Sequence, residues 1–221
     1  MSFDRRSPSI GLVLLPPGNC VCSDSGYLRS RRKMSDSRVW FPGNPWADDG
    51  HAVKTFNWTA ETFEGDVWFL FRLETENYNV EEASKPVSSG EASSSSWEQP
   101  EAWEKFDRSL LNSEDGFCVG PLDDYDAEDL DGRTFAVDPL PLEEGWEPED
   151  LIFQSYILGH DSVADHRITL TSRLDSDNFD IDWTCKVALT YSGETEFRHG
   201  FHATIKDIAA PAPKPMEVPI D

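Results

Sequence analysis

The clearest pattern in the chain is a regular alternation of apolar and polar side chains in its C-terminal third. The apolar residues of one uninterrupted run occupy every odd-numbered position: Phe179, Ile181, Trp183, Cys185, Val187, Leu189 and Tyr191. The residues between them are charged, hydroxyl-bearing or small. Because successive side chains of a β-strand point to opposite faces, this run predicts a strand with one buried and one solvated face.

The same alternation continues on both sides of this run. Its further apolar members are Ile168, Leu170, Leu174, Phe197, Phe201, Ala203 and Ile205. The connections at 175–178 and 192–194 are short enough to permit only antiparallel neighbours. We therefore expect a three-stranded antiparallel meander over residues 166–207, with Trp183 and Phe201 sealed from water.

A hairpin is predicted earlier in the chain, over residues 51–74, with its turn near Gly65. Its second strand, 67–73, is apolar on both faces, which is typical of a strand that is covered twice. Residues 151–158 are apolar enough to form another buried strand. Two prolines make the run 135–142 an edge strand or an extended connection.

One helix is predicted, over residues 100–111. Pro100 suits the first turn of a helix, and Trp103, Phe106 and Leu110 fall on one face. Acidic and basic residues four positions apart would add ion pairs along its exposed side. We expect the aromatic face of this helix to pack on the core.

These elements predict a mainly β fold, all-β or α+β: an antiparallel β-sandwich or a meander sheet with one short helix packed on it. The domain is expected at 34–208, with a flexible Ser-rich loop at 83–96 and a Pro-rich disordered tail at 209–221. Residues 1–33 are interpreted as an extension outside the core, with translation starting at Met34.

Charge is the most unusual property of the composition. The chain has 42 acidic and 19 basic residues, a formal net charge of −23. Residues 1–33 carry six basic and two acidic side chains, net +4, so the remaining chain carries −27. Such a chain repels phosphate backbones, which argues against nucleic acid as a partner. The charge keeps the protein soluble, which is its first explanation, and it also steers the chain towards cationic partners.

Neither a membrane span nor a disulfide framework is predicted. No segment approaches the ~20 apolar residues that a membrane helix needs. The four cysteines, Cys20, Cys22, Cys118 and Cys185, match neither a disulfide framework nor paired zinc half-sites. We expect a cytoplasmic protein, with export as the alternative if residues 1–33 act as a signal.

One segment has the composition of a metal site. Residues 159–167, GHDSVADHR, are predicted to form a hairpin turn that contains His160, Asp161, Asp165 and His166. These side chains could bind a divalent metal, but the two histidines do not have the i,i+4 spacing of a helical zinc pair. Turn-forming chemistry explains the Asp and Ser residues better.

The acidic loops raise a second metal hypothesis. Residues 123–131 have alternate carboxylates, yet Asp129 stands where an EF-hand loop requires Gly. Calcium would therefore need several loops to meet, such as 123–131 with Asp175 and Asp177. His199 is expected to face the core and His202 the solvent.

The sequence contains no nucleophile elbow, phosphate loop or dinucleotide fingerprint. We therefore favour a non-catalytic binding module that engages a cationic protein surface. One alternative is a metal-dependent hydrolase that uses the four residues of 159–167. Another is a carbohydrate or small-ligand β-sandwich, which would need exposed rings from the Trp residues without a core assignment: Trp40, Trp46, Trp58, Trp97 and Trp146.

Overall fold

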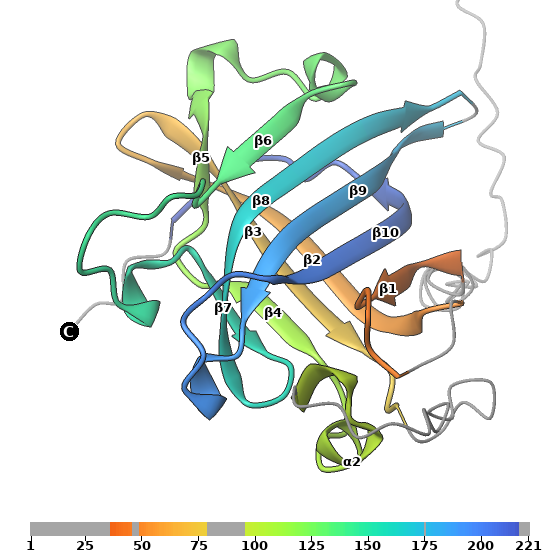
Figure 1. The fold of residues 1–221 in the computed structure, drawn as a ribbon. Coiled ribbons are helices and arrows are strands. Elements are labelled where there is room, and N and C mark those ends of the chain that lie inside the picture. The colour runs from red at the N-terminus through yellow and green to blue at the C-terminus, as the bar shows by residue number, and fades with distance from the viewer. Residues whose placement is uncertain (1–35, 46–48, 79–95, 175, 217–221) are drawn as a thin grey trace, which may run out of the picture.

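The computed structural model describes residues 36–45, 49–78, 96–174 and 176–216, and its strands form one eleven-stranded sheet (Figure 1). The strands are β1 (Arg38–Trp40), β2 (His51–Phe63), β3 (Asp66–Thr75), β4 (Leu110–Ser113), β5 (Phe117–Pro121), β6 (Thr134–Val137), β7 (Phe153–Tyr156), β8 (His160–Arg173), β9 (Ser176–Ala188), β10 (His199–Ala209) and β11 (Lys214–Pro215). The short helices are η3 (Ser96–Glu98), α2 (Pro100–Trp103), η4 (Leu122–Asp124), η5 (Glu128–Leu130), η6 (Pro148–Asp150) and η7 (Thr190–Ser192).

Eight of the strands close into a barrel. The ring runs β1, β2, β3, β4, β7, β8, β9 and β10, and β10 pairs with β1 again. Every neighbouring pair in this ring is antiparallel. The prediction of a mainly β, antiparallel fold is confirmed, but the prediction of a sandwich or an open meander sheet is wrong. A sandwich and a barrel bury alternate residues in the same way, so the sequence pattern does not distinguish them.

The predicted meander is present as β8, β9 and β10, which pair in consecutive antiparallel register. Trp183 is fully buried and Phe201 is 2% exposed, as the alternation required. The predicted hairpin is β2 and β3, turned by Glu64 and Gly65, which both have positive φ angles (52° and 90°). Two such residues in a two-residue turn match the twist of the strands that they connect.

Aromatic rings fill the interior of the barrel. The ring of Trp183 lies 4.9 Å from Phe153, 5.3 Å from Phe201 and 5.9 Å from Phe71, measured between centroids. An eight-stranded barrel is just wide enough for side chains to fill it. The inward row of the meander therefore packs against side chains from the opposite wall instead of a second sheet.

The predicted helix over 100–111 is wrong beyond its first turn. Only Pro100–Trp103 is α-helical, and Leu110 already belongs to β4. Leu111 is fully buried between β3 and β7, and Arg108 pairs with Glu74 of β3 at 3.1 Å. Isolated helices of this length are marginal in water, so strand pairing and burial outweigh the local preference.

The strand expected up to Tyr191 ends at Ala188 and is followed by η7. Tyr191 is 68% exposed, and Phe197 lies outside the strands. The carbonyl of Leu189 accepts hydrogen bonds from the backbone N–H groups of Ser192 and Glu194, which turns the chain away from the sheet. Leu174, also expected in the inward row, lies at the β8–β9 turn and is fully exposed.

The Pro-rich tail pairs with the sheet in part, contrary to expectation. Lys214 and Pro215 form β11, a parallel partner of Glu61 and Thr62 on β2. Proline is tolerated here because β11 is an edge strand that pairs on one side. Residues 1–33, most of the Ser-rich loop and residues 217–221 lie outside the described residues.

No helix in the described ranges is long and apolar enough to cross a membrane.

A substitution pair tests the barrel interior. Trp183→Ala should lower the free energy of unfolding by about 3–5 kcal/mol, because it leaves a cavity among packed rings. Leu174→Ala should change it by no more than about 0.5 kcal/mol, because the side chain is exposed. Urea denaturation measures both. Equal losses for the two variants would contradict the assignment of Trp183 to the interior and Leu174 to the surface.

Candidate interaction surface

The chain leaves the ring between β4 and β7, and we call this excursion, residues 114–152, the acidic segment. It adds β5 to the edge of β3 and β6 to β8 before it returns as β7. Apolar side chains fasten it to the barrel: Phe117, Leu130, Phe135 and Val137 are each at most 9% exposed. The part of the segment from Phe117 to Val137 is therefore held to the barrel.

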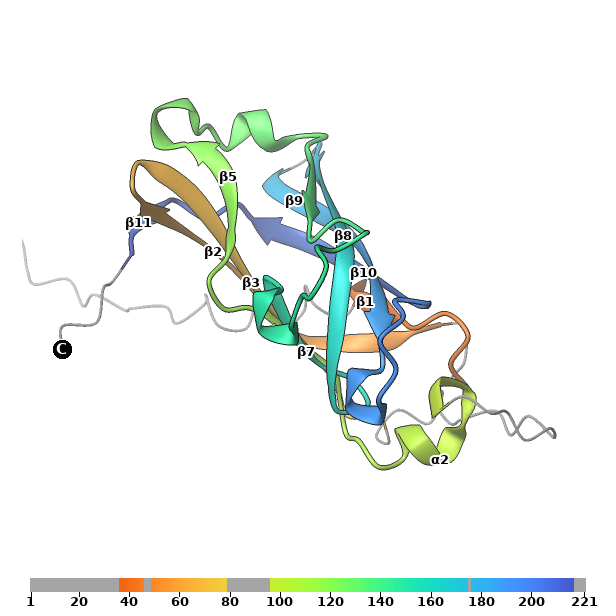
Figure 2. The same ribbon diagram turned by 60° about the vertical axis from the view of Figure 1, so that its left-hand side comes forward.

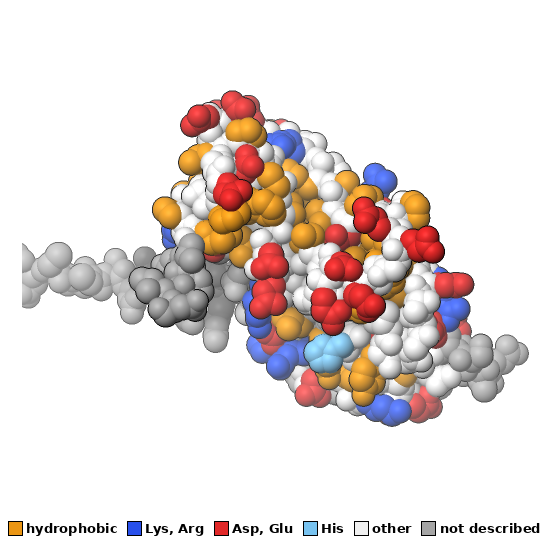
Figure 3. All heavy atoms as spheres, turned by 90° about the vertical axis from the view of Figure 1, so that its left-hand side faces the viewer, with side chains coloured by type: hydrophobic (Ala, Val, Ile, Leu, Met, Phe, Trp, Pro, Cys, Tyr) orange, Lys and Arg blue, Asp and Glu red, His pale blue; other side chains and the backbone are white. Residues whose placement is uncertain are grey.

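The acidic segment carries most of the net charge of the protein. Its acidic residues are Glu114, Asp115, Asp123, Asp124, Asp126, Glu128, Asp129, Asp131, Asp138, Glu143, Glu144, Glu147, Glu149 and Asp150. Against these fourteen stands one basic residue, Arg133, so 39 residues carry −13 of the total −23. All of the acids except Asp138 are exposed. Figure 3, which faces this side of the barrel, shows carboxylates around apolar patches and few basic groups.

Several of these carboxylates also hold the local backbone. The Asp126 side chain accepts the N–H of Glu128 at 2.9 Å, and the Asp150 side chain accepts the N–H of Glu147 at 2.8 Å. Asp131 accepts the N–H of Ser172 at 2.7 Å, and this bond lowers the pKa of its carboxyl group. Hydrogen bonds of this kind explain why Asp is frequent in turns, but they leave the negative charge uncompensated.

The basic residue of the segment does not neutralise its carboxylates. The Arg133 guanidinium donates to the carbonyl of Val119 at 3.1 Å and lies 4.9 Å above the ring of Phe135. Among the described residues, no ion pair joins a carboxylate of the segment to a lysine, arginine or histidine.

The acids on the β8–β10 face behave differently, because they have basic partners. Asp180 is bridged by Arg173 and by Lys206, each at 3.0 Å. Asp182 lies 2.8 Å from the ring of His202, whose side chain is 38% exposed, in agreement with its predicted outward position. The acidic segment is thus distinguished by missing counter-charges and not only by the number of its acids.

The first metal hypothesis placed its four residues in a turn. The structure places them in strand β8 instead. His160 is exposed, whereas Asp161 is 5% exposed and accepts the N–H of Leu158 at 2.8 Å. Asp165 has a φ of 54° at a register shift, and His166 is buried. The turn is instead formed by 157–159, because the 160–164 run pairs with both β7 and β9.

The surroundings of His166 argue against metal binding. The indole N–H of Trp183 donates to Nδ1 of His166 at 3.0 Å. Because an indole nitrogen can only donate, the proton of the neutral imidazole resides on Nε2, which leaves no lone pair for a metal. Within the described residues, no group of three or more His, Cys, Asp or Glu side chains could hold a metal ion. This includes the described part of 123–131 with Asp177; Asp175 lies outside it.

The tryptophans proposed as sugar platforms are separated. Trp58 and Trp97 belong to the core, at 7% and 1% exposed. Trp40 stacks on His202 and Trp146 contacts Phe197, so the two half-buried rings have different partners. Trp46 lies outside the described residues.

A buried polar cluster at one end of the barrel was not identified from the sequence. His51 packs against the ring of Tyr78 (4.7 Å between centroids), whose hydroxyl bonds to that of Ser109. Burial lowers the pKa of His51 to about 4, against the opposing effect of Asp49. His51 begins β2, whereas Tyr78 follows β3 and Ser109 precedes β4, so the alternating pattern does not mark them before the strands are paired. His199 stacks on buried Trp97 with its side chain 10% exposed, as expected of a core-facing residue.

The buried imidazole of His166 predicts a dependence of stability on acid. Burial lowers its pKa from 6.5 to about 3, so the unfolded chain binds a proton across this window and the folded chain does not. The contribution of His166 to the free energy of unfolding is therefore fully present above pH 6.5. It is lost as the pH falls towards 3, by about 1.4 kcal/mol per pH unit. Denaturant titrations from pH 7 to pH 4 should show a shallower loss for His166→Gln. Parallel curves for the two proteins would contradict a neutral, buried His166.

No family model matches the chain, and the comparisons with curated proteins and with solved structures also found no match.

Proposed function

We propose that this protein is a non-catalytic binding domain that engages a cationic protein surface through its acidic segment. One observation carries the proposal: fourteen acids against one base on a single excursion, without an ion pair to neutralise them among the described residues. Uncompensated carboxylates on one face attract a basic partner and orient it during encounter.

The architecture supports this use of the segment. Binding residues are commonly found on connecting segments that a rigid scaffold positions. Here the scaffold is a closed ring with a packed aromatic interior, and the segment is fixed to it by buried Phe117 and Phe135. The carboxylates of the segment are therefore held close to one another, and no basic side chain among the described residues pairs with them.

Apolar side chains on or next to the segment add contact area. Leu122 and Leu140 of the segment are 42% and 38% exposed, and Tyr156 of the adjoining β7 is 37% exposed. Trp146 is half-buried against Phe197. Partly exposed aromatic and aliphatic groups surrounded by charge are typical of protein interfaces, where they contribute affinity while the charges contribute orientation.

The test compares two variants with the same net charge. The first neutralises six acids of the segment, as Asp or Glu to Asn or Gln, at Asp123, Asp124, Glu128, Asp129, Glu143 and Glu144. The second neutralises six exposed acids elsewhere: Glu64, Glu76, Glu101, Glu104, Asp107 and Asp177. Binding is measured by surface plasmon resonance at low salt, with egg-white lysozyme as the cationic probe protein.

We expect the segment variant to lose at least about tenfold in affinity, mostly in the association rate, and the matched variant to lose about threefold or less. Wild-type binding should weaken steeply with salt, because the charges are exposed. Equal losses for the two variants would show that only total charge matters, and the acidic segment would then serve solubility alone.

A further inference from the structure

Two acidic loops that are far apart in the sequence meet at a pair of aromatic side chains. Trp146 lies in the connection between β6 and β7, and Phe197 lies between η7 and β10. The centroids of their rings are 5.3 Å apart, and their planes are tilted by 44°. Both loops lie on the left-hand side of the barrel in Figure 1 and come forward in Figure 2. We call these two side chains the aromatic pair.

The backbone holds Trp146 between two hydrogen-bonded turns. On one side, its N–H donates to the carbonyl of Glu143 at 3.3 Å, and Gly145 supplies a positive φ of 86° within this turn. On the other side, Glu147 and Asp150 form a capping box around η6, in which each side chain accepts the backbone N–H of the other. The indole ring is therefore presented by a fixed loop, which lowers the entropic cost of using it for binding.

The aromatic pair keeps part of its surface in water. Both residues are half-buried, whereas the core rings of Trp183 and Phe69 are fully buried. The face of an aromatic ring carries a partial negative charge and attracts a cation, and tryptophan does so more strongly than phenylalanine. The pair thus offers an apolar surface that also favours a positive group.

The carboxylates around the aromatic pair lack counter-charges. The base closest to the pair in the sequence, Arg198, is already bridged to Glu194. Other acids lie within three residues of one of the two rings in the sequence, are exposed, and make no side-chain hydrogen bond or ion pair among the described residues: Glu143, Glu144, Glu149 and Glu196. A partner that covered this surface without bringing positive charge would bury carboxylates unpaired, which is costly.

We propose that the cationic partner of the acidic segment docks an arginine side chain on the aromatic pair, with its guanidinium on the ring of Trp146 and its N–H groups directed at the carboxylates of the two loops. This inference rests on the proposed function and adds the type of residue that is recognised. Aromatic rings and arginine are also the groups that most often dominate the affinity of protein interfaces.

Arginine fits this surface better than lysine does. Its planar guanidinium is weakly hydrated and stacks on aromatic faces, and its fork of N–H donors matches the geometry of carboxylates. A lysine ammonium is a compact and strongly hydrated charge, so it loses more solvation when it is placed on a ring. The carboxylates attract both residues, and the ring of Trp146 distinguishes between them.

The test compares two peptides of equal charge, hexa-arginine and hexalysine, labelled with the same dye. Their binding to the full chain is measured by fluorescence anisotropy at low salt. We expect the wild type to bind hexa-arginine about fivefold more tightly than hexalysine, and Trp146→Leu to abolish this preference while changing hexalysine binding by less than about twofold. Trp146→Phe should give an intermediate preference, because its ring attracts cations less strongly.

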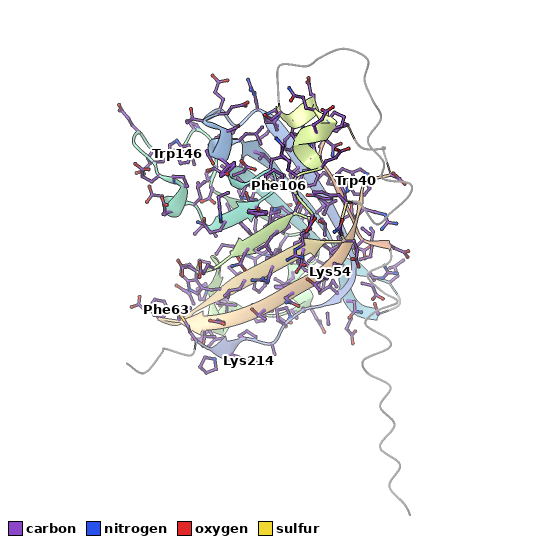
Figure 4. All side chains as sticks on the ribbon, turned by 90° about the horizontal axis from the view of Figure 1, so that it is seen from below. Trp40, Lys54, Phe63, Phe106, Trp146 and Lys214 are labelled. Atoms are coloured by element: carbon purple, nitrogen blue, oxygen red, sulfur yellow. The ribbon has the colours of Figure 1, made fainter. Side chains whose placement is uncertain are left out.

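Trp40→Leu is the matched control. Trp40 is also half-buried, but its ring stacks on His202, and Figure 4 shows it apart from Trp146. This variant should keep the preference for hexa-arginine. Circular dichroism and the denaturation midpoint establish that each variant is folded. In the wild type, the NMR signal of the Trp146 indole N–H, identified by its loss in Trp146→Leu, should shift when hexa-arginine binds.

The outcomes separate this inference from the proposed function. An unchanged preference in both Trp146 variants, an equal loss in Trp40→Leu, or an indole signal that does not move would overturn the arginine site. The proposed function would survive that result if the six-acid variant of the segment still lost lysozyme binding relative to its matched variant. It would fail separately if those two variants lost equally.

Discussion

The structure depends on the match between the width of an eight-stranded ring and the volume of its aromatic interior. Trp183 is the centre of that interior, with rings from β3, β7 and β10 around it at 4.9–5.9 Å and His166 hydrogen-bonded to its indole nitrogen. Closure of the barrel requires each strand to pair on both sides. The packed aromatic side chains hold the opposite walls at the spacing that allows this pairing. The filling is complete at Trp183, which is fully buried.

Closure has a consequence for the surface. In a closed barrel both edges of each strand are used for pairing within the barrel. The features that distinguish this chain lie in the segments outside it. Between β4 and β7, the chain leaves the ring and exposes its carboxylates while burying apolar anchors such as Phe117 and Phe135. After β10, residues 210–216 are held in part by Tyr125 of that same segment, whose hydroxyl donates to the carbonyl of Pro211. The ring and the segments outside it are thus separate in sequence but attached to each other in space.

The sequence predicts the parts of this fold that depend on local pattern. The β8–β10 meander and the β2–β3 hairpin follow from strict alternation, and alternation survives in any architecture that buries one face. The helix over 100–111 failed because its propensity is weak compared with the burial of Leu111 between two strands. The Gly, Asp and Ser of the 159–167 run favour a turn, but its pairing with β7 and β9 places it in a strand. Ring closure depends on pairings between distant segments, such as β1 with β10, which no local pattern encodes.

The central claim, a closed barrel packed around Trp183, is tested most directly by hydrogen exchange at the indole N–H of Trp183, followed by NMR. The account predicts exchange only through global unfolding, with an opening free energy equal to that from denaturant titration and the same response to denaturant. Exchange within minutes, independent of denaturant, would mean that Trp183 reaches water in the native state and would contradict the closed, filled ring.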